Sequence, residues 1–198
     1  MIFQDPLTSL NPLYTVGQHL VETMLTHLDI RPAAARKRAL ALLDEVGIPA
    51  PAQRIDHYPH QFSGGMRQRV MIAMALALEP KLLIADEPTT ALDVTIQAQV
   101  LDLLADIQRR QGMGMLLITH DLGVVARMAH RVGVMYAGEV VETGARGAFF
   151  EASLHPYSRK LFAALPGAGK RGNALDAPEG SVPPLDRQFP GCRFAERC

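Results

Sequence analysis

A short apolar run that ends in two carboxylates constrains this chain more than any other feature. Leu82 to Ala85 is apolar throughout, and Asp86, Glu87 and Pro88 follow it directly. Such a run predicts a buried strand of a parallel sheet, because strands covered on both faces lack polar alternation. Ligands of open α/β sheets bind at the carboxyl ends of the strands. The acid pair alone fits a metal ligand beside a water-activating carboxylate, and it fits equally well a strand running into a polar turn.

The composition permits a packed core and excludes several classes of protein. The chain has 198 residues, of which 48% are hydrophobic, and no apolar run approaches the roughly 20 residues of a membrane span. The first five residues lack the regions of a signal peptide, so we expect a cytosolic protein. Zero net charge gives no electrostatic case for a nucleic-acid partner. The two cysteines lie near the end of the chain, so no disulfide framework holds its body together.

Strand and helix patterns alternate after the acid pair. Leu92 and Asp93 precede a helical pattern that they are expected to cap, and Gly112 ends it. Residues 115–119 then predict a second buried strand, with His120 at its carboxyl end. A further helical stretch leads to two predicted strands, 132–136 and 139–143. This order indicates an α/β fold with a mostly parallel sheet.

The part of the chain before the acid pair is mostly helical in pattern. Residues 1–5 have strand character, and helices are predicted from Val16 and from Pro32 to Gly47. Ser63, Gly64 and Gly65 then stand at the start of another helix. Exposed N–H groups at such a start bind phosphate well, but an ordinary Ser-capped helix has the same sequence, so these residues alone leave both readings open.

The character of the sequence changes near residue 153. Pro156 begins a short helical pattern, and beyond Pro166 the chain is rich in Gly, Pro and Ala with little periodicity. We therefore predict a main domain over residues 1–152 and an irregular C-terminal region over residues 153–198.

Considered together, the motifs resemble those of ABC-transporter ATPases. Five of them occur in the family's order: Gln4 as the Q-loop glutamine, residues 63–69 as the signature motif (with Met66 where Gln is commoner), residues 82–87 as the Walker B strand, residues 91–93 as the D-loop, and His120 as the switch histidine. Residues 155–157 (His-Pro-Tyr) and 191–194 (Gly-Cys-Arg-Phe) resemble the C-terminal region of the oligopeptide/dipeptide importer subfamily.

One departure from the family pattern concerns the phosphate-binding loop. The sequence contains no Gly-x-x-x-x-Gly-Lys-Ser/Thr, and its single Gly-Lys pair, Gly169-Lys170, has Ala164 at the first glycine's position and Arg171 at the hydroxyl position. The resemblance therefore implies an ABC-type P-loop NTPase fold that lacks its N-terminal part, with a helical subdomain over about residues 5–78. As given, the chain is expected to be a fragment that binds ATP weakly and is poorly stable alone.

The resemblance also assigns roles to residues around ATP and Mg²⁺. Ser63, Gly64, Gly65 and Met66 would bind the γ-phosphate held by an opposite subunit, and Asp93 would lie at the interface between the two subunits. On the other side of the nucleotide, Asp86 would bind Mg²⁺, and Gln4 would contact either Mg²⁺ or the hydrolytic water. Glu87 would polarise that water, and His120 would contact the γ-phosphate.

Cys192 and Cys198 leave two interpretations open. The importer subfamily carries cysteine-rich tails that bind an iron–sulfur cluster, but such a cluster usually needs four ligands, which favours free thiols here.

The implied function is ATP-driven import of di- or oligopeptides. The implied partners are a second ATPase subunit, transmembrane permease subunits and, indirectly, an extracytoplasmic solute-binding protein, with this chain peripheral at the cytoplasmic face of the bacterial inner membrane. Two alternatives remain: a catalytically dead remnant or regulatory partner, which the missing loop keeps open, and a non-transport ABC ATPase.

Overall fold

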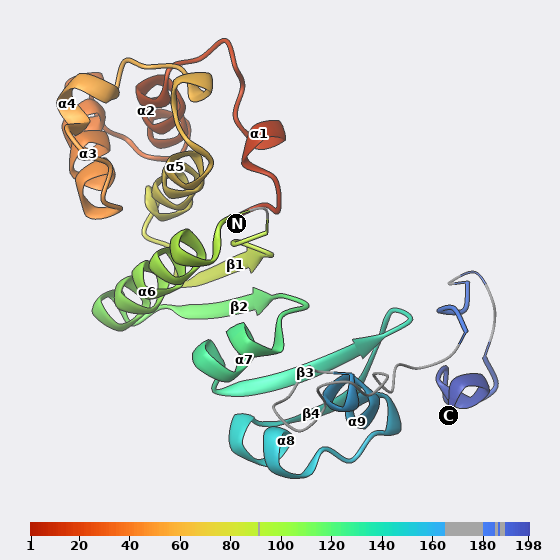
Figure 1. Cartoon of the computed structure of the whole chain (residues 1–198). Helices are drawn as coiled ribbons and strands as arrows, with labels where there is room; N and C mark the ends of the chain where they lie inside the picture. The colour runs from red at the N-terminus through yellow and green to blue at the C-terminus, as the bar shows by residue number, and fades with distance from the viewer. Residues whose placement is uncertain (91, 165–179, 185, 187–188) are drawn as a thin grey trace. The chain divides into compact units, whose positions relative to one another are not determined.

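The chain forms two compact units in a computed structural model that describes residues 1–90, 92–164, 180–184, 186 and 189–198. Unit 1 comprises Met1–Asp121 and unit 2 comprises Leu122–Cys198 (Figure 1). The domain boundary predicted after residue 152 was drawn from the change in sequence character, and it stays a prediction.

Unit 1 begins with a group of helices. Their bounds are α1 Pro6–Ser9, α2 Val16–His27, α3 Pro32–Glu45, α4 Pro51–Arg54, the 3-10 turn η1 Pro59–Gln61, and α5 Gly64–Leu76. Thr15 begins α2 with a capping box, in which its hydroxyl accepts from the backbone of Gln18 and the Gln18 side chain accepts from the backbone of Thr15. The helix predicted from Val16 is confirmed, and its residues Val16, Leu20 and Met24 are fully buried.

The parallel strands of unit 1 follow these helices. β1 (Leu82–Asp86) pairs in parallel with β2 (Gly114–Ile118), from Leu82 opposite Gly114 to Asp86 opposite Ile118. On the other side of β1, Ile2 forms a parallel bridge with Ala85. The first residues, β1 and β2 therefore run in the same direction, and their carboxyl ends lie at one edge.

The prediction that both strands are buried on both faces is wrong. Leu83 and Ala85 lie in the core, but Leu82, Leu116 and Ile118 are 57%, 52% and 45% exposed. The burial of β1 and β2 alternates because only one face of this sheet is covered by other described residues. Because the sequence of both strands is apolar without interruption, it does not distinguish the covered face of the sheet from the exposed face.

Helix α6 (Val94–Gln111) connects the two strands. Its buried residues are Val100, Leu101, Leu104 and Ile107, and Gly112 ends it with a φ of +63°, where the stop was predicted. Asp93 stands at the capping position, but its side chain makes no capping hydrogen bond. The expected side-chain cap is therefore wrong, although the helix begins where it was predicted.

Unit 2 is built on a hairpin. β3 (Arg131–Tyr136) pairs antiparallel with β4 (Glu139–Ala145), and Ala137 and Gly138 form the turn with φ values of +47° and +81°. The helices of the unit are α7 Leu122–Met128, α8 Arg146–Ala152, α9 Pro156–Ala163 and the 3-10 turn η2 Ala195–Arg197. Phe194 is 1% exposed and packs against Tyr136 and Tyr157, so the last residues belong to the core of this unit.

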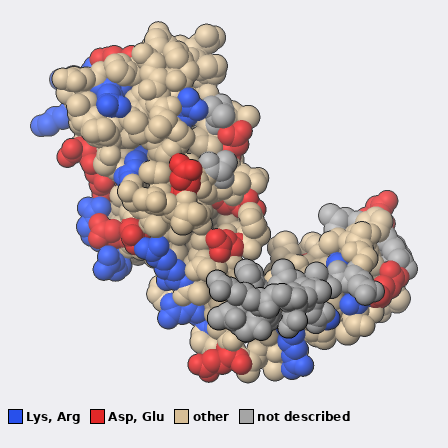
Figure 2. Space-filling model, viewed as in Figure 1, with Lys and Arg blue, Asp and Glu red and all other residues tan. Residues whose placement is uncertain are grey.

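Two further observations concern the surface. No helix in the described ranges combines the length and hydropathy that crossing a membrane requires. Over the face drawn in Figure 2, Lys and Arg side chains lie interspersed with Asp and Glu, in keeping with the zero net charge of the sequence.

Candidate functional site

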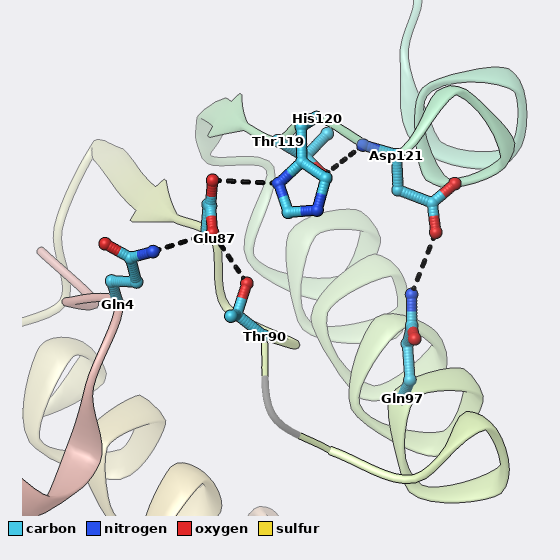
Figure 3. Close-up of polar contacts among 7 residues, drawn as sticks. All are labelled: Gln4, Glu87, Thr90, Gln97, Thr119, His120 and Asp121. Carbon is cyan, nitrogen blue, oxygen red and sulfur yellow. Dashed lines mark hydrogen bonds and ion pairs between the residues drawn. The ribbon is translucent and has the colours of Figure 1, made fainter. Parts of the chain in front are cut away.

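Three predicted site residues from distant parts of the chain meet at one edge of the parallel strands (Figure 3). Gln4 follows the residues that pair with β1, Glu87 follows β1 itself, and His120 comes shortly after β2. The structure thus brings together side chains that the sequence separates by more than thirty and more than eighty positions. The parallel pairing is the cause, because it places all three strand ends side by side.

The carboxylate of Glu87 is the centre of this cluster. Its Oε2 accepts from Gln4 Nε2 at 2.8 Å and from Thr90 Oγ1 at 2.7 Å. Its Oε1 lies 2.9 Å from Nδ1 of His120, which must carry a proton to donate to a carboxylate. A carboxylate has about four acceptor sites, so roughly one remains for a further donor. The Glu87 side chain is 21% exposed, so solvent reaches it.

These hydrogen bonds change the acidity of Glu87. The bond from His120, followed by the bond from Thr90 and more weakly that from Gln4, lowers the pKa of Glu87 below its ordinary value against the opposing effect of partial burial. Glu87 is therefore ionised at neutral pH. Such a carboxylate is suited to orient a water molecule and to polarise it as a general base.

The backbone of Glu87 is unusual for its residue type. Its φ is +43°, in the left-handed region that favours glycine, and its N–H donates to the carbonyl oxygen of Ile118 at 2.9 Å. A non-glycine residue in this conformation costs on the order of 1–3 kcal/mol, and such residues cluster at functional sites. The conformation turns the chain sharply after β1, next to the end of β2.

The turn that carries His120 is fixed to α6. The backbone N–H of Asp121 donates to Thr119 Oγ1 at 3.1 Å, and Gln97 Nε2 donates to Asp121 Oδ2 at 3.3 Å (Figure 3). His120 itself is 77% exposed, so its free ring edge faces solvent.

Asp86 ends β1 immediately before Glu87. Its backbone N–H donates to the carbonyl oxygen of Ile2, and among the described residues its half-buried carboxylate has no hydrogen-bond or ion-pair partner. Within the same limits, the Gln4 amide oxygen also lacks a partner, while its nitrogen is engaged by Glu87. Both are oxygen ligands of the kind that Mg²⁺ prefers, so the residues present fit this ion.

The signature residues lie at the start of α5, as predicted. The hydroxyl of Ser63 accepts from the backbone N–H of Met66 at 3.4 Å, and Ser63 and Gly64 are exposed. Met66 is half-buried, and its sulfur accepts from Arg54 Nη1 at 3.5 Å. The contacts of the described residues do not join this segment to Gln4, Glu87 or His120.

The signature glycines pack instead against the residues around Asp93. A Cβ on Gly64 would lie 3.7 Å from Leu92 Cδ2, an ordinary contact, whereas a Cβ on Gly65 would lie 2.6 Å from Ile96 Cγ2. Gly65 is thus required by close packing against α6, a role that the sequence did not reveal. Asp93 is exposed, and Ala91 lies outside the described residues.

The cysteines do not assemble a metal site among the described residues. Cys192 and Cys198 are both free and exposed, and no group of three or more His, Cys, Asp or Glu side chains in that part of the chain is placed to hold a metal ion. Sγ of Cys192 lies 3.7 Å from Nε2 of His155. These residues do not fit an iron–sulfur cluster, which usually needs four ligands. Gly169 and Lys170 lie outside the described residues.

Sequence reasoning missed Thr90. Its hydroxyl makes the shortest of the hydrogen bonds to Glu87, and its backbone N–H donates to the carbonyl oxygen of Glu87 at 3.1 Å. The signal was available, since a hydroxyl residue three positions after an acid is placed to close a turn on it.

Comparison with known proteins shows what the chain is similar to. The family model for ABC transporters matches residues 1–90, and the model for the C-terminal region of oligopeptide/dipeptide transporters matches residues 141–198. The dipeptide transport ATP-binding proteins DppD of Bacillus subtilis (strain 168) and Escherichia coli (strain K12) are each 55% identical over the whole chain. The oligopeptide transport ATP-binding protein OppD of B. subtilis is 54% identical over the same length. The chain spans 59%, 61% and 55% of these relatives, respectively.

Solved structures show the same fold. The ATP-binding cassette MJ0796, solved as a dimer in a post-hydrolysis state bound to ADP and Pi, has a TM-score of 0.64 and 31% identity, covering 73% of this chain and 61% of that one. CbiO1 from Clostridium perfringens, part of the ABC transporter complex cbiONQ, has a TM-score of 0.65 and 33% identity, covering 77% of this chain and 59% of that one. The chain thus has the fold of these ATP-binding cassettes, and over its whole length it is similar to the ATP-binding proteins of dipeptide and oligopeptide transporters.

Proposed function

We propose that this chain supplies the water-activating and signature residues of an ATPase that drives import of di- or oligopeptides. The observation that carries the proposal is the convergence of Gln4, Thr90 and His120 on the ionised carboxylate of Glu87. The names of the relatives, which are dipeptide and oligopeptide transport ATP-binding proteins, support the substrate class. Because the chain spans about 60% of the DppD relatives, the activity of the whole protein is part of the proposal.

We assign to Glu87 the role of orienting and polarising the hydrolytic water. Three donors hold its carboxylate in one orientation, and its remaining acceptor site takes a hydrogen bond from the water. With its lowered pKa it polarises the attacking oxygen while the phosphoryl group transfers, which is mostly a matter of position and charge. Asp86 and the amide oxygen of Gln4 would hold Mg²⁺, which when bound neutralises charge on the phosphate oxygens.

We assign to His120 the role of donating a hydrogen bond to the γ-phosphate. Its Nδ1–H is engaged by Glu87, so its exposed Nε2 can donate to a phosphate oxygen only when the ring is protonated or when the Glu87 contact is released. Either change couples phosphate contact to the state of Glu87. The charge that develops in the transition state is then met by a positioned donor.

We assign the surface formed by the starts of α5 and α6 to the interface with an opposite ATPase subunit. The exposed starts of α5 and α6 present Ser63, Gly64 and Asp93 to solvent, where a second ATPase subunit and its nucleotide would lie. Gly65 and Met66 complete this signature segment behind them. Transmembrane permease subunits are the expected partners of the helices of unit 1, at the cytoplasmic face of the membrane, with a solute-binding protein acting on the outer side.

The Glu87 assignment is tested by ATP hydrolysis in the native complex. The chain is tagged at its chromosomal locus and purified with its partners, and turnover is measured for wild type, Glu87→Gln and Glu79→Gln. Glu87→Gln is expected to lower turnover about 10²- to 10⁴-fold with ATP binding retained, because a positioned general base contributes about that much. Glu79 is the matched control, since its exposed carboxylate pairs with Arg38 outside the site.

The outcomes separate the alternatives. Unchanged turnover in Glu87→Gln would overturn the role of Glu87. A wild-type complex that contains this chain and transports peptide without any turnover at its site would favour the regulatory partner, which the absence of a Gly-x-x-x-x-Gly-Lys-Ser/Thr sequence here keeps open. A complex without permease subunits would favour the non-transport ATPase.

A further inference from the structure

Arg69, in the second turn of α5, joins three helices of unit 1. Its Nη1 donates to the carbonyl oxygen of Val46 at 2.6 Å, and its Nη2 donates to Oε1 of Gln99 at 3.2 Å. Val46 is the C-cap residue that follows α3, and Gln99 lies in α6. Arg69 itself belongs to α5, the helix that the signature residues begin. One half-buried guanidinium therefore spans from the end of α3 to the helix that follows Asp93.

The end of α3 is shaped to receive this group. Carbonyl oxygens in the last turn of a helix lack partners within the helix, and the negative end of the helix dipole favours a cation. Gly47 follows with a φ of +75°, and a Cβ there would lie 2.8 Å from Nη1 of Arg69. A side chain at Gly47 would therefore displace the guanidinium from its hydrogen bond with Val46.

The contact with α6 continues a close seam between α5 and α6. Gly65 lies one turn before Arg69 on α5 and packs against Ile96, where a Cβ would approach Cγ2 to 2.6 Å. Ile96 and Gln99 lie on the same side of α6, because residues three apart are neighbours on a helix. The seam thus consists of an apolar contact beside the signature glycines and a hydrogen bond one turn later.

The neighbouring basic residue behaves differently. Arg67 donates from Nε to the carbonyl oxygen of Pro59 at 2.7 Å and from Nη2 to that of His60 at 3.4 Å, so it holds the loop ahead of the signature segment. Among the described residues, Arg69 is thus the basic residue of this motif whose side-chain hydrogen bonds reach both the end of α3 and α6.

We propose that Arg69 is a positioning residue for the ATPase reaction, which fixes the signature segment and Asp93 in one arrangement and ties both to the end of α3. The proposal rests on the proposed function, because it assigns Ser63–Gly65 and Asp93 to the opposite subunit's nucleotide and interface. A displacement of α3 then moves the start of α6 together with the signature segment. The planar fork of Arg is needed, since a single ammonium cannot hold both acceptors in this geometry.

The first test is the kinetics of the native complex. Arg69→Ala is expected to lower kcat for ATP hydrolysis about 10- to 100-fold, the effect of a small misplacement of catalytic groups, with KM for ATP changed far less. Arg69→Lys should not restore kcat. Gln99→Ala should lower kcat, and the double variant should be no worse than Arg69→Ala alone, because both remove the same link. Gln99→Glu keeps the acceptor and should retain activity.

Arg38→Ala is the matched control. Arg38 donates to Glu79 at 2.8 Å and so links α3 to the end of α5 without reaching α6. It should leave kcat near that of wild type. Equal losses in Arg38→Ala and Arg69→Ala would show general weakening of the helical region, and additive losses in the Arg69/Gln99 pair would show independent roles. Either result would overturn the proposal.

Amide hydrogen exchange of the purified chain tests the link without relying on activity. Arg69→Ala should speed exchange both at residues 46–48 and at the first turns of α6, and Arg38→Ala should not affect α6. If the wild-type complex hydrolyses no ATP while exchange changes as described, the proposed function fails and the mechanical link stands. If exchange at α6 is unaffected by Arg69→Ala, the link fails whatever the activity of the complex.

Discussion

Gly64 and Gly65 are adjacent glycines in the signature segment, yet the structure gives them different requirements. A Cβ on Gly64 would meet Leu92 Cδ2 at 3.7 Å, which is ordinary contact, while a Cβ on Gly65 would meet Ile96 Cγ2 at 2.6 Å. Both residues lie in the first turn of α5, so replacing either with Ala gains about the same helix stabilisation, roughly 0.5–1 kcal/mol. The difference between the two variants therefore isolates the clash.

The expected size of that difference follows from overpacking. Cγ2 of Ile96 is attached to a stiff β-branched carbon, so relief requires a shift of α5 against α6, and such forced shifts typically cost about 1–3 kcal/mol. Gly64→Ala should be neutral or slightly stabilising, and Gly65→Ala should be less stable than Gly64→Ala by about 1–3 kcal/mol. In an Ile96→Ala background the difference should disappear, because the obstructing atom is gone.

The assay is urea unfolding of the chain, followed by far-UV circular dichroism, with hydrogen exchange of α5 amides to assign the transition to unit 1. Equal stability of the two variants, or a difference that persists with Ile96→Ala, would refute the packing argument. A separate expectation concerns function. Gly64→Ala should keep its stability yet lower ATP turnover in the native complex, because a methyl group there obstructs the approach of phosphate to the start of the helix.

Further predictions follow from Glu87 and from unit 2. Because the hydrogen bond from His120 is the largest cause of the lowered pKa of Glu87, His120→Ala should raise that pKa toward its ordinary value of 4.5, as a carboxyl ¹³C titration by NMR would show; an unchanged titration would contradict the hydrogen bond. A carboxyl with a lowered pKa stabilises the folded chain above its unfolded value and loses that contribution as the pH falls, so the stability gap between wild type and His120→Ala should shrink on acidification. Phe194→Ala should destabilise unit 2 by about 3–5 kcal/mol in urea titrations, since Phe194 is buried against Tyr136 and Tyr157. Leu154→Ala, at a position that is 76% exposed, should change stability by less than about 0.5 kcal/mol, and comparable losses in both variants would refute the packing of the C-terminal residues.

The sequence predicted the positions of the helices, strands and turns better than it predicted which of their side chains are buried. The apolar run that begins at Leu82, the glycine stop at Gly112 and the hairpin turn at Ala137 each depend on local chemistry, and all lie where they were expected. Exposure of Ile118 was not predicted, because burial depends on which face of a strand other elements cover. The missing side-chain cap of Asp93 has a similar origin, since a capping residue type does not fix the direction of its carboxylate.

The candidate site shows the same division between residue type and geometry. Glu87 was identified from its place after a strand, but its pKa depends most on His120, a distant residue that the parallel register brings to it, and next on nearby Thr90. The left-handed backbone of Glu87 adds a cost that the hydrogen bonds from Gln4, Thr90 and His120 must offset. The geometry of this carboxylate is therefore set by its neighbours rather than by local preference. Removing a neighbour should weaken both the fold and the chemistry of the site, and Glu87→Gln, which keeps one acceptor oxygen, should mainly affect the chemistry.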